Sequence, residues 1–226
     1  LSAVFTKNML DAGLGALNVA FWRLLPSGVL FCGHTLLKRD FKLKTTRDLW
    51  LLAGFALFTI ALNYLSFNYA IAHGGASLVN VLLATTPAFI ALPAWLFLRE
   101  KLTLRLLNLL LLSVVGLLLA SWGSGKGIYI SLASLSFSVL AVLTSAAFTL
   151  FSKPLLNRYT PVTLNAFVMP LAALALLPFV SFTDADKLLH SWFDLTLLVL
   201  LPSYLAYLLY QTGLKKLEVS QTALLT

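Results

Sequence analysis

The sequence predicts an all-α membrane protein built from two five-helix repeats of opposite orientation. Three observations predict this fold class. The chain of 226 residues is 60% hydrophobic and only 11% charged, whereas soluble domains are about half apolar and a quarter charged. Its apolar runs reach the roughly 20 residues that a membrane-spanning helix requires. Two pairs of similar segments also recur at nearly the same interval along the chain.

The apolar runs are expected to be helices, because they are too long for strands and show no strict alternation. A helix also satisfies its backbone hydrogen bonds within its own segment, as lipid demands. Since the first and last runs are shorter than a span, we expect the chain to begin within one helix and end within another. The expected helices are residues 1–10, 16–37, 49–72, 76–98, 104–121, 127–152, 161–182, 193–213 and 218–226.

The basic residues predict how these helices are oriented. Twelve of the 16 Lys and Arg residues fall in alternate gaps on one side, and five of them lie in residues 38–48. Gaps of this kind face the cytoplasm, so we expect the first helix to run from the inside to the outside. The net charge of +8 therefore reflects membrane orientation, and we expect the lipid bilayer, not nucleic acid, as a partner.

Two stretches early in the chain resemble two later ones. Residues 4–13 pair with 150–159 at an interval of 146, and residues 63–77 pair with 206–220 at an interval of 143. Two matches in the same order at nearly one interval indicate a duplication. In the second pair, Tyr64 aligns with Tyr207.

The length of the repeat predicts its geometry. Five expected helices separate equivalent points, and because five is odd, the second copy must cross the membrane in the opposite sense. Inverted repeats are typical of alternating-access transporters, in which the solute binds near the midplane between the copies. The predicted repeats are residues 1–124 and 125–226.

One block of sequence points to a family. Residues 74–121 contain a small-residue turn (Gly74 and Gly75), a helix with a central proline, the stretch REKLT, and a helix with a late glycine, Gly116. This block resembles the end of the first repeat in EamA-type members of the drug/metabolite transporter superfamily. Residues 213–226 resemble the start of the equivalent region in the second repeat.

The resemblance implies a ten-helix transporter fold with both termini cytoplasmic, of which this chain is a fragment covering most of nine helices. It implies secondary transport, usually export, of a small organic solute such as an amino acid or related metabolite, through a cavity lined by helices 1–4 and 6–9. We therefore expect an integral, multi-pass protein of a bacterial or archaeal inner membrane that needs no cofactor. The resemblance does not name the solute.

Polar side chains at mid-depth are the candidates for binding the solute, because polar groups that face lipid are penalised. The alternative is that they form interhelical hydrogen bonds that hold the bundle together. We favour the alternative for the threonines, and both interpretations stay open for Asn63, Tyr64 and Tyr207. The full set is Asn63, Tyr64, Asn68, Thr85, Thr86, Tyr204, Tyr207 and Gln211.

Pro87 interrupts the predicted fourth helix close to mid-depth. It removes one backbone N–H and clashes one turn back, and the carbonyls that it frees are tolerated where they line a cavity or find other donors. The sequence leaves open whether this bend shapes or gates a cavity or is a static packing kink.

Lys7 and Arg23 are the charges expected inside helices, both toward the outer side. Each alone is expected to extend its charged end to the membrane interface. Together they predict a positive outer vestibule, which would favour solutes with a carboxylate or phosphate, so we add Arg23 to the solute-binding candidates.

Other functions are less compatible with the pattern. An intramembrane enzyme needs convergent His, Asp, Glu or Ser residues, but the three His are scattered and no acid lies at mid-span. Cys32 and His34 are too few for a zinc site, and we expect no metal. A structural membrane subunit would not need inverted repeats. A small-xxx-small pattern at residues 116–120 leaves a homodimer open.

Overall fold

The computed structural model describes residues 2–83, 86, 89, 90, 108, 111, 112, 115, 131–182 and 185–216. Within these residues all regular elements are helical, which confirms the prediction of an all-α protein. Five of the helices are long and apolar enough to cross a membrane, and each end lies within five residues of a predicted span. They are Ala16–Leu37, Thr46–Gly75, Leu132–Leu156, Pro161–Phe179 and Trp192–Lys216. The expected helices at 104–121 and 218–226 lie outside the described residues, apart from a few isolated positions.

Helices α2 (Ala16–Leu37) and α8 (Pro161–Leu176) pack closely along each other. Their approach depends on Gly28 of α2, since a Cβ atom there would lie 2.9 Å from Cγ and 3.0 Å from the backbone N of Pro170 in α8. A proline ring cannot rotate away. The sequence therefore places its smallest residue against its most rigid one.

The second span changes geometry twice. Helix α3 (Thr46–Phe55) continues through a π-helical segment, η1 (Ala56–Ala61), into α4 (Leu62–Leu83). Helix α4 breaks at Gly75, whose φ of 77° and ψ of 162° lie in a region that essentially only glycine adopts. The break confirms the predicted turn between the third and fourth helices. Around it, α4 packs along α7 (Leu132–Leu156).

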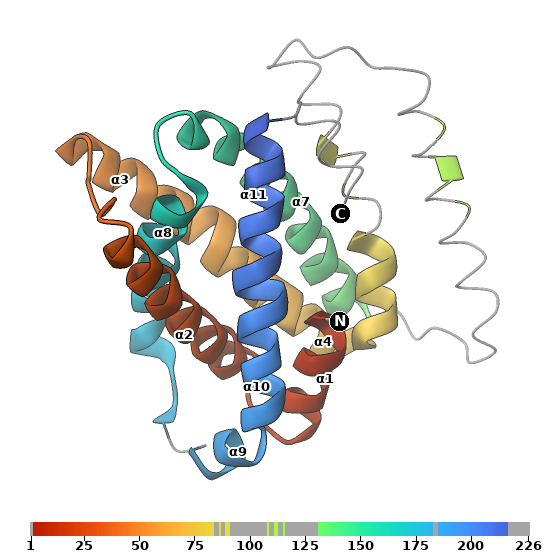
Figure 1. Ribbon diagram of the computed structural model, residues 1–226. Coiled ribbons are helices and arrows are strands. Elements are labelled where there is room, and N and C mark those ends of the chain that lie inside the picture. The colour runs from red at the N-terminus through yellow and green to blue at the C-terminus, as the bar shows by residue number, and fades with distance from the viewer. Residues whose placement is uncertain are drawn as a thin grey trace.

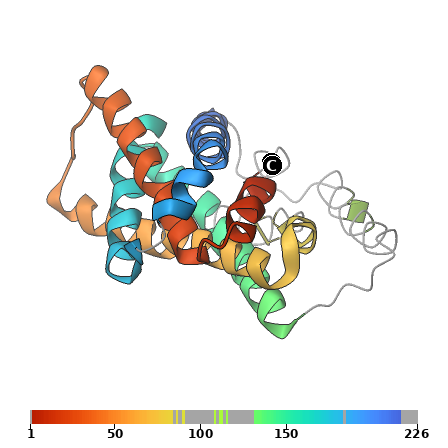
Figure 2. The same cartoon turned by 90° about the horizontal axis from the view of Figure 1, so that it is seen from below.

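The last described span passes through α10 (Trp192–Leu198), the π-helical segment η4 (Val199–Leu205) and α11 (Ala206–Lys216). In Figure 1 it lies in front of the bundle, between α2 and α7. Figure 2 looks almost along α11, and the short α1 (Ser2–Asp11) lies beside this span.

A short helix, α9 (Ala185–His190), lies where the sequence predicted a loop. Its charges explain why it forms, because Asp186 lies in the first turn and Lys187 and His190 in the last. This distribution complements the helix dipole.

The two π-helical segments recur at a fixed interval. Val199 begins η4 143 positions after Ala56 begins η1, which is also the interval from Tyr64 to Tyr207. In space, α2 packs against η4 while α8 packs against η1. The same backbone irregularity thus lies at matching positions of two spans.

Hydroxyl groups supply hydrogen bonds inside both segments. Thr59 donates to the Phe55 carbonyl at 2.6 Å in the first, and Ser203 donates to the Leu198 carbonyl at 2.8 Å in the second. Pro202 within η4 has no N–H to contribute to the helix. Side-chain donors of this kind are what permits irregular backbone at membrane depth.

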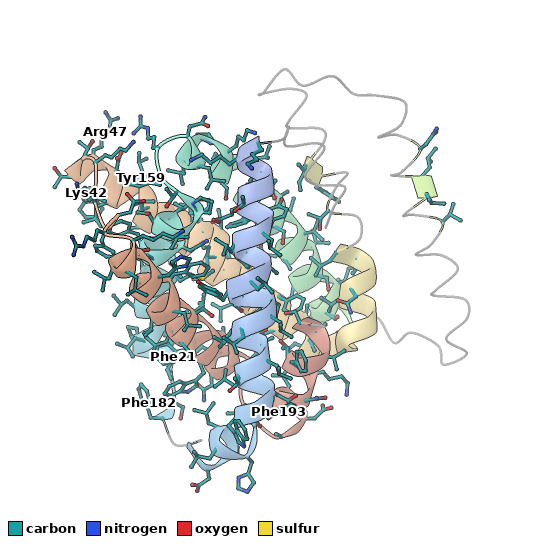
Figure 3. The ribbon with its side chains drawn as sticks, in the orientation of Figure 1. Phe21, Lys42, Arg47, Tyr159, Phe182 and Phe193 are labelled. Carbon is teal, nitrogen blue, oxygen red and sulfur yellow. The ribbon has the colours of Figure 1, made fainter. Side chains whose placement is uncertain are left out.

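Positive charge gathers at one end of the bundle, which we call the basic end, and α9 lies at the other, the α9 end (Figure 1). Figure 3 labels Lys42, Arg47 and Tyr159 at the basic end and Phe182 and Phe193 at the α9 end. The described basic residues at the basic end are Lys38, Arg39, Lys42, Lys44, Arg47, Lys153, Arg158, Lys215 and Lys216.

A buried carboxylate joins distant segments at the basic end. Asp48, which is 3% exposed, accepts hydrogen bonds from Arg158 at 3.0 Å and from the Tyr159 hydroxyl at 2.7 Å. Burial raises the pKa of that hydroxyl, which stays protonated as a donor. The start of α3 is therefore tied to the turn between α7 and α8.

Hydrogen bonds join a different pair of segments at the α9 end. The Asn18 side chain donates to the Ser181 carbonyl at 3.0 Å and accepts from the Ser181 N–H at 3.2 Å. Lys187 donates to the Gly13 carbonyl at 3.1 Å. The turn before α2 is thereby held against the segment that follows α8.

The contact of Gly28 with Pro170 predicts that Gly28→Ala destabilises the protein. The added methyl group overpacks the α2–α8 contact, and such overpacking costs about 1–3 kcal/mol. Gly33→Ala in the same helix is the matched control, because a Cβ there meets nothing within 4 Å, and alanine is favoured over glycine inside a helix. Midpoints of thermal unfolding in detergent measure the difference. A midpoint for Gly28→Ala as high as that for Gly33→Ala would show that the helices are not in close contact at this point.

Candidate functional site

Arg23 of α2 is buried where α1, α2, α4 and η4 meet. It is only 5% exposed. Its Nε donates to the Ser203 hydroxyl at 2.7 Å, and its Nη1 donates to the Ser2 hydroxyl at 2.9 Å. Its guanidinium carbon lies 4.3 Å from the centre of the Tyr64 ring. Four elements thus converge on one charged group.

Aromatic rings continue from this point into the bundle. The Tyr64 ring contacts the Tyr207 ring at 6.4 Å between centroids, and Tyr207 contacts Phe148 of α7 at 5.3 Å. Phe148 also contacts Tyr210, whose hydroxyl shares a hydrogen bond of 2.7 Å with Thr149. We call Tyr64, Tyr207, Phe148 and Tyr210 the aromatic wall. The wall begins at Tyr64, whose ring lies against the arginine, and its rings come from three spans.

The burial of Arg23 corrects one expectation from the sequence. Arg23 does not extend its charge to the interface, because its guanidinium finds hydroxyl acceptors and a ring face inside the bundle. Lys7 differs, since it is exposed and forms an ion pair of 2.6 Å with Asp11. Sequence spacing alone suggested that the two cations act together, but the structure places them in different environments.

The guanidinium has donors to spare. Arginine carries five N–H groups, and among the described residues only two acceptors, Ser203 and Ser2, lie within hydrogen-bond distance. No described carboxylate lies within 4.0 Å of Arg23. Tyr64, whose ring lies against the guanidinium, is also buried. The arrangement presents a positive, donor-rich group beside aromatic surface.

Asn63 links helices. Its amide nitrogen lies 2.8–3.0 Å from the Ala141 carbonyl and the hydroxyls of Thr144 and Ser145, all on α7. These contacts favour the interhelical hydrogen-bonding interpretation, because the amide donors are already used between α4 and α7.

The two other predicted amides are fully buried and each bonds to the first turns of another helix. Asn68 donates to the Ala16 carbonyl at 3.0 Å, where α2 begins. Gln211 exchanges two hydrogen bonds, of 2.7 and 3.2 Å, with Asn165 near the start of α8. The Asn68 carbonyl oxygen has no partner within the described segments.

Tyr204 contacts residues other than those of the aromatic wall. Its hydroxyl shares a hydrogen bond of 2.6 Å with Nδ1 of His34, and its ring lies against Phe31 at 4.7 Å. Cys32 donates to the Ala166 carbonyl at 3.2 Å. His34 and Cys32 thus contact different partners.

Three predicted residues lie on the fourth helix. Thr86 is buried, and its hydroxyl has no partner in the described part of the chain. Thr85 and Pro87 lie outside the described residues.

Sequence reasoning missed Ser203, Ser2 and Asn165. Ser203 accepts from Arg23, and Asn165 pairs with Gln211. The sequence could have identified Asn165, because an amide inside an apolar span is costly without a partner. A serine has no comparable signal, since its hydroxyl readily bonds to its own helix.

The Gln211–Asn165 contact predicts a coupled effect on stability. Asn165→Leu leaves the Gln211 amide buried without its partner, which costs about 1–3 kcal/mol. Replacing both residues by leucine removes the unpaired group and should recover most of the loss. Unfolding midpoints of both single variants and the double variant measure the coupling, with Thr212→Val, which changes an exposed hydroxyl, as control. Additive losses would show that the two amides do not depend on each other.

Comparison with known proteins supplies the family. A sequence model described as the EamA-like transporter family matches residues 1–122 and 132–226. A protein of Archaeoglobus fulgidus named an uncharacterized transporter is 23% identical over 212 residues, which cover 93% of this chain and 74% of that protein. The uncharacterized transporter YetK of Bacillus subtilis is 26% identical over 211 residues, which cover 88% of this chain and 61% of its own length.

Proposed function

The chain belongs to the EamA-like transporter family, and from this premise we propose that it moves a small organic solute, an amino acid or related metabolite, by alternating access between two inverted repeats. The family and its five apolar spans make it an integral, multi-pass membrane protein. The solute, the mechanism and the export direction are our proposal.

The observation that carries this proposal is the contact between Tyr64 and Tyr207 beside the buried Arg23. The two tyrosines occupy equivalent positions of the proposed repeats, 1–124 and 125–226. Residues related by a twofold operation contact each other only where they lie near the axis. In inverted-repeat transporters the solute binds near that axis at the midplane, so these side chains form the proposed site.

Two further features support the duplication. The π-helical segments η1 and η4 begin 143 positions apart, the interval of the tyrosines. Asn68 and Gln211, separated by the same interval, each bond to the first turns of the helix that comes second in its repeat. Both features recur at the interval of the sequence match, which supports the proposed duplication.

The orientation follows from charge. Nine described basic residues lie at the basic end, and cytoplasmic segments are enriched in Lys and Arg. We propose that this end faces the cytoplasm of a bacterial or archaeal cell, that the α9 end faces outward, and that both termini of the full chain are cytoplasmic.

An intramembrane enzyme and a structural subunit are the rival functions. An enzyme would require acid, base or nucleophile groups gathered at one depth. Around Arg23 the described side chains are hydroxyls and aromatic rings, without a carboxylate or imidazole in contact. A structural subunit gives no reason for a buried charge at this meeting point, because buried ions generally cost stability.

Transport by the full-length protein in liposomes tests the proposal. We expect saturable uptake of at least one member of a panel of labelled amino acids and related carboxylic and amine metabolites, and acceleration when the unlabelled solute is loaded on the other side. Counterflow of this kind requires a site that alternates between the two faces. Liposomes without protein are the control, because they measure passive leak of each solute. The absence of saturable flux for every member of the panel would contradict transport of this solute class.

The aromatic wall predicts which tyrosine matters for transport. Tyr207→Leu removes ring contacts with Tyr64 and Phe148, worth about 1 kcal/mol beyond burial, and should lower the transport rate about tenfold. Tyr69→Leu is the matched control, because Tyr69 lies in the same span as Tyr64 but stacks on Phe137 and His73 instead. Equal losses in the two variants would show that the wall has no special role.

A further inference from the structure

We propose that Arg23 binds the carboxylate of a monocarboxylic acid whose apolar part lies against the aromatic wall. The proposal rests on the proposed function only in taking this ligand to be the transported solute. Binding itself can be measured without transport.

The charge balance of the buried site favours an anion. A guanidinium removed from water is stabilised by a ring face and by hydroxyl acceptors, both of which Arg23 has. Neither neutralises its charge, and an uncompensated buried charge is strongly unfavourable. Among the described residues no carboxylate is close enough to do so. An anion supplied from outside would complete the set of partners.

The shape of the group selects a carboxylate. Ser203 holds Nε and Ser2 holds Nη1, while Tyr64 covers one face, so the plane of the guanidinium is fixed. Nη2 and the second hydrogen on Nη1 remain as donors in the described part of the chain. Two neighbouring N–H groups in a fixed plane match the two oxygens of a carboxylate.

In the proposed repeats, the charged group of the site has no charged counterpart. At the interval of 146 the counterpart of Arg23 is Met169, and at the interval of 143 the counterpart of Ser203 is Ile60. Both counterparts are fully buried in the main hydrophobic core. Arg23 and its acceptor Ser203 therefore correspond to two apolar side chains, Met169 and Ile60, in the proposed repeats.

This asymmetry defines the ligand class. A solute with an anion at each end would place its second charge toward apolar side chains, where an unpaired charge is costly. A solute with one carboxylate and an apolar part meets complementary groups at both ends. The apolar part would lie beside the aromatic wall. Tyr64 connects the two parts of the site, because its ring contacts both Arg23 and Tyr207.

Thermal stabilisation of the full-length protein in detergent tests the proposal, because a ligand that binds the folded state raises the unfolding midpoint. The probes are 3-phenylpropionate, its uncharged amide 3-phenylpropionamide, acetate, and the dicarboxylate succinate. We expect 3-phenylpropionate to raise the midpoint at concentrations at least about tenfold below those required by any other probe, a gap that corresponds to about 1.4 kcal/mol. Equal effects of the acid and its amide would overturn the proposal, as would the absence of any effect of 3-phenylpropionate.

Variants at the two outer cations then locate the binding group. Arg23→Gln should weaken 3-phenylpropionate binding at least about tenfold, and Arg23→Lys, which keeps the charge but loses the planar pair of donors, should weaken it less. Lys7→Gln is the matched control, because Lys7 is exposed and paired with Asp11. Unchanged binding in Arg23→Gln would overturn the proposal. If Arg23→Gln does not fold, the acid and amide on the unmodified protein decide the question.

The outcome separates this inference from the proposed function. Binding of 3-phenylpropionate without any saturable flux in liposomes would support the carboxylate site and contradict transport. Saturable flux of cationic or neutral solutes, with no effect of 3-phenylpropionate, would support transport and overturn the carboxylate site.

Discussion

A single buried cation constrains the arrangement of the helices around it. Arg23 needs acceptors that water would otherwise provide, and inside an apolar bundle they must come from other helices. Ser2 of α1 and Ser203 of η4 accept two of its N–H groups, and Tyr64 of α4 covers one face of the guanidinium. Because each partner belongs to a different element, the contacts of one charged group bring four segments together. Ser203 lies in a π-helical segment, where its hydroxyl both accepts from Arg23 and donates to its own backbone.

The bundle repeats its geometry but not its polarity. Two π-helical segments, two tyrosines and two amides recur at one interval among the described residues. The cation and its hydroxyl do not recur, since Met169 and Ile60 stand at the corresponding positions. On our proposal that the scaffold is duplicated, the one unmatched charge would give a solute a preferred orientation. That combination suits a transporter better than a static membrane subunit.

Contacts between sequence-distant segments join the described bundle at both ends. Asp48 joins the start of α3 to the α7–α8 turn at the basic end. Asn18 and Ser181 join the first turn of α2 to the segment after α8 at the α9 end. The first network contains an ion pair between a buried carboxylate and an exposed arginine, and the second contains only uncharged groups and one exposed lysine. Opening either end toward water would require exchanging these bonds for bonds to solvent.

The sequence by itself determined the class of the protein and the placement of its spans. Lipid imposes a required length and apolarity on each helix, and both are local properties of a run such as 16–37 or 161–182. The charge distribution and the interval between Tyr64 and Tyr207 can likewise be read directly from the sequence. A helix as short as α9 could not be predicted in this way, because six residues with helix-compatible charges also fit a loop.

Only the tertiary structure decided what the polar side chains do. Asn63 and Gln211 were solute-binding candidates by depth alone, but their donors are occupied by α7 and by Asn165. Arg23 was expected to reach the interface, yet it is buried between hydroxyls and a ring. A hydrogen bond depends on the direction and distance of a partner on another helix, and those depend on how helices rotate against one another, as at Gly28 and Pro170. Hydrophobicity places a helix in the membrane, but packing sets the face that each polar group presents.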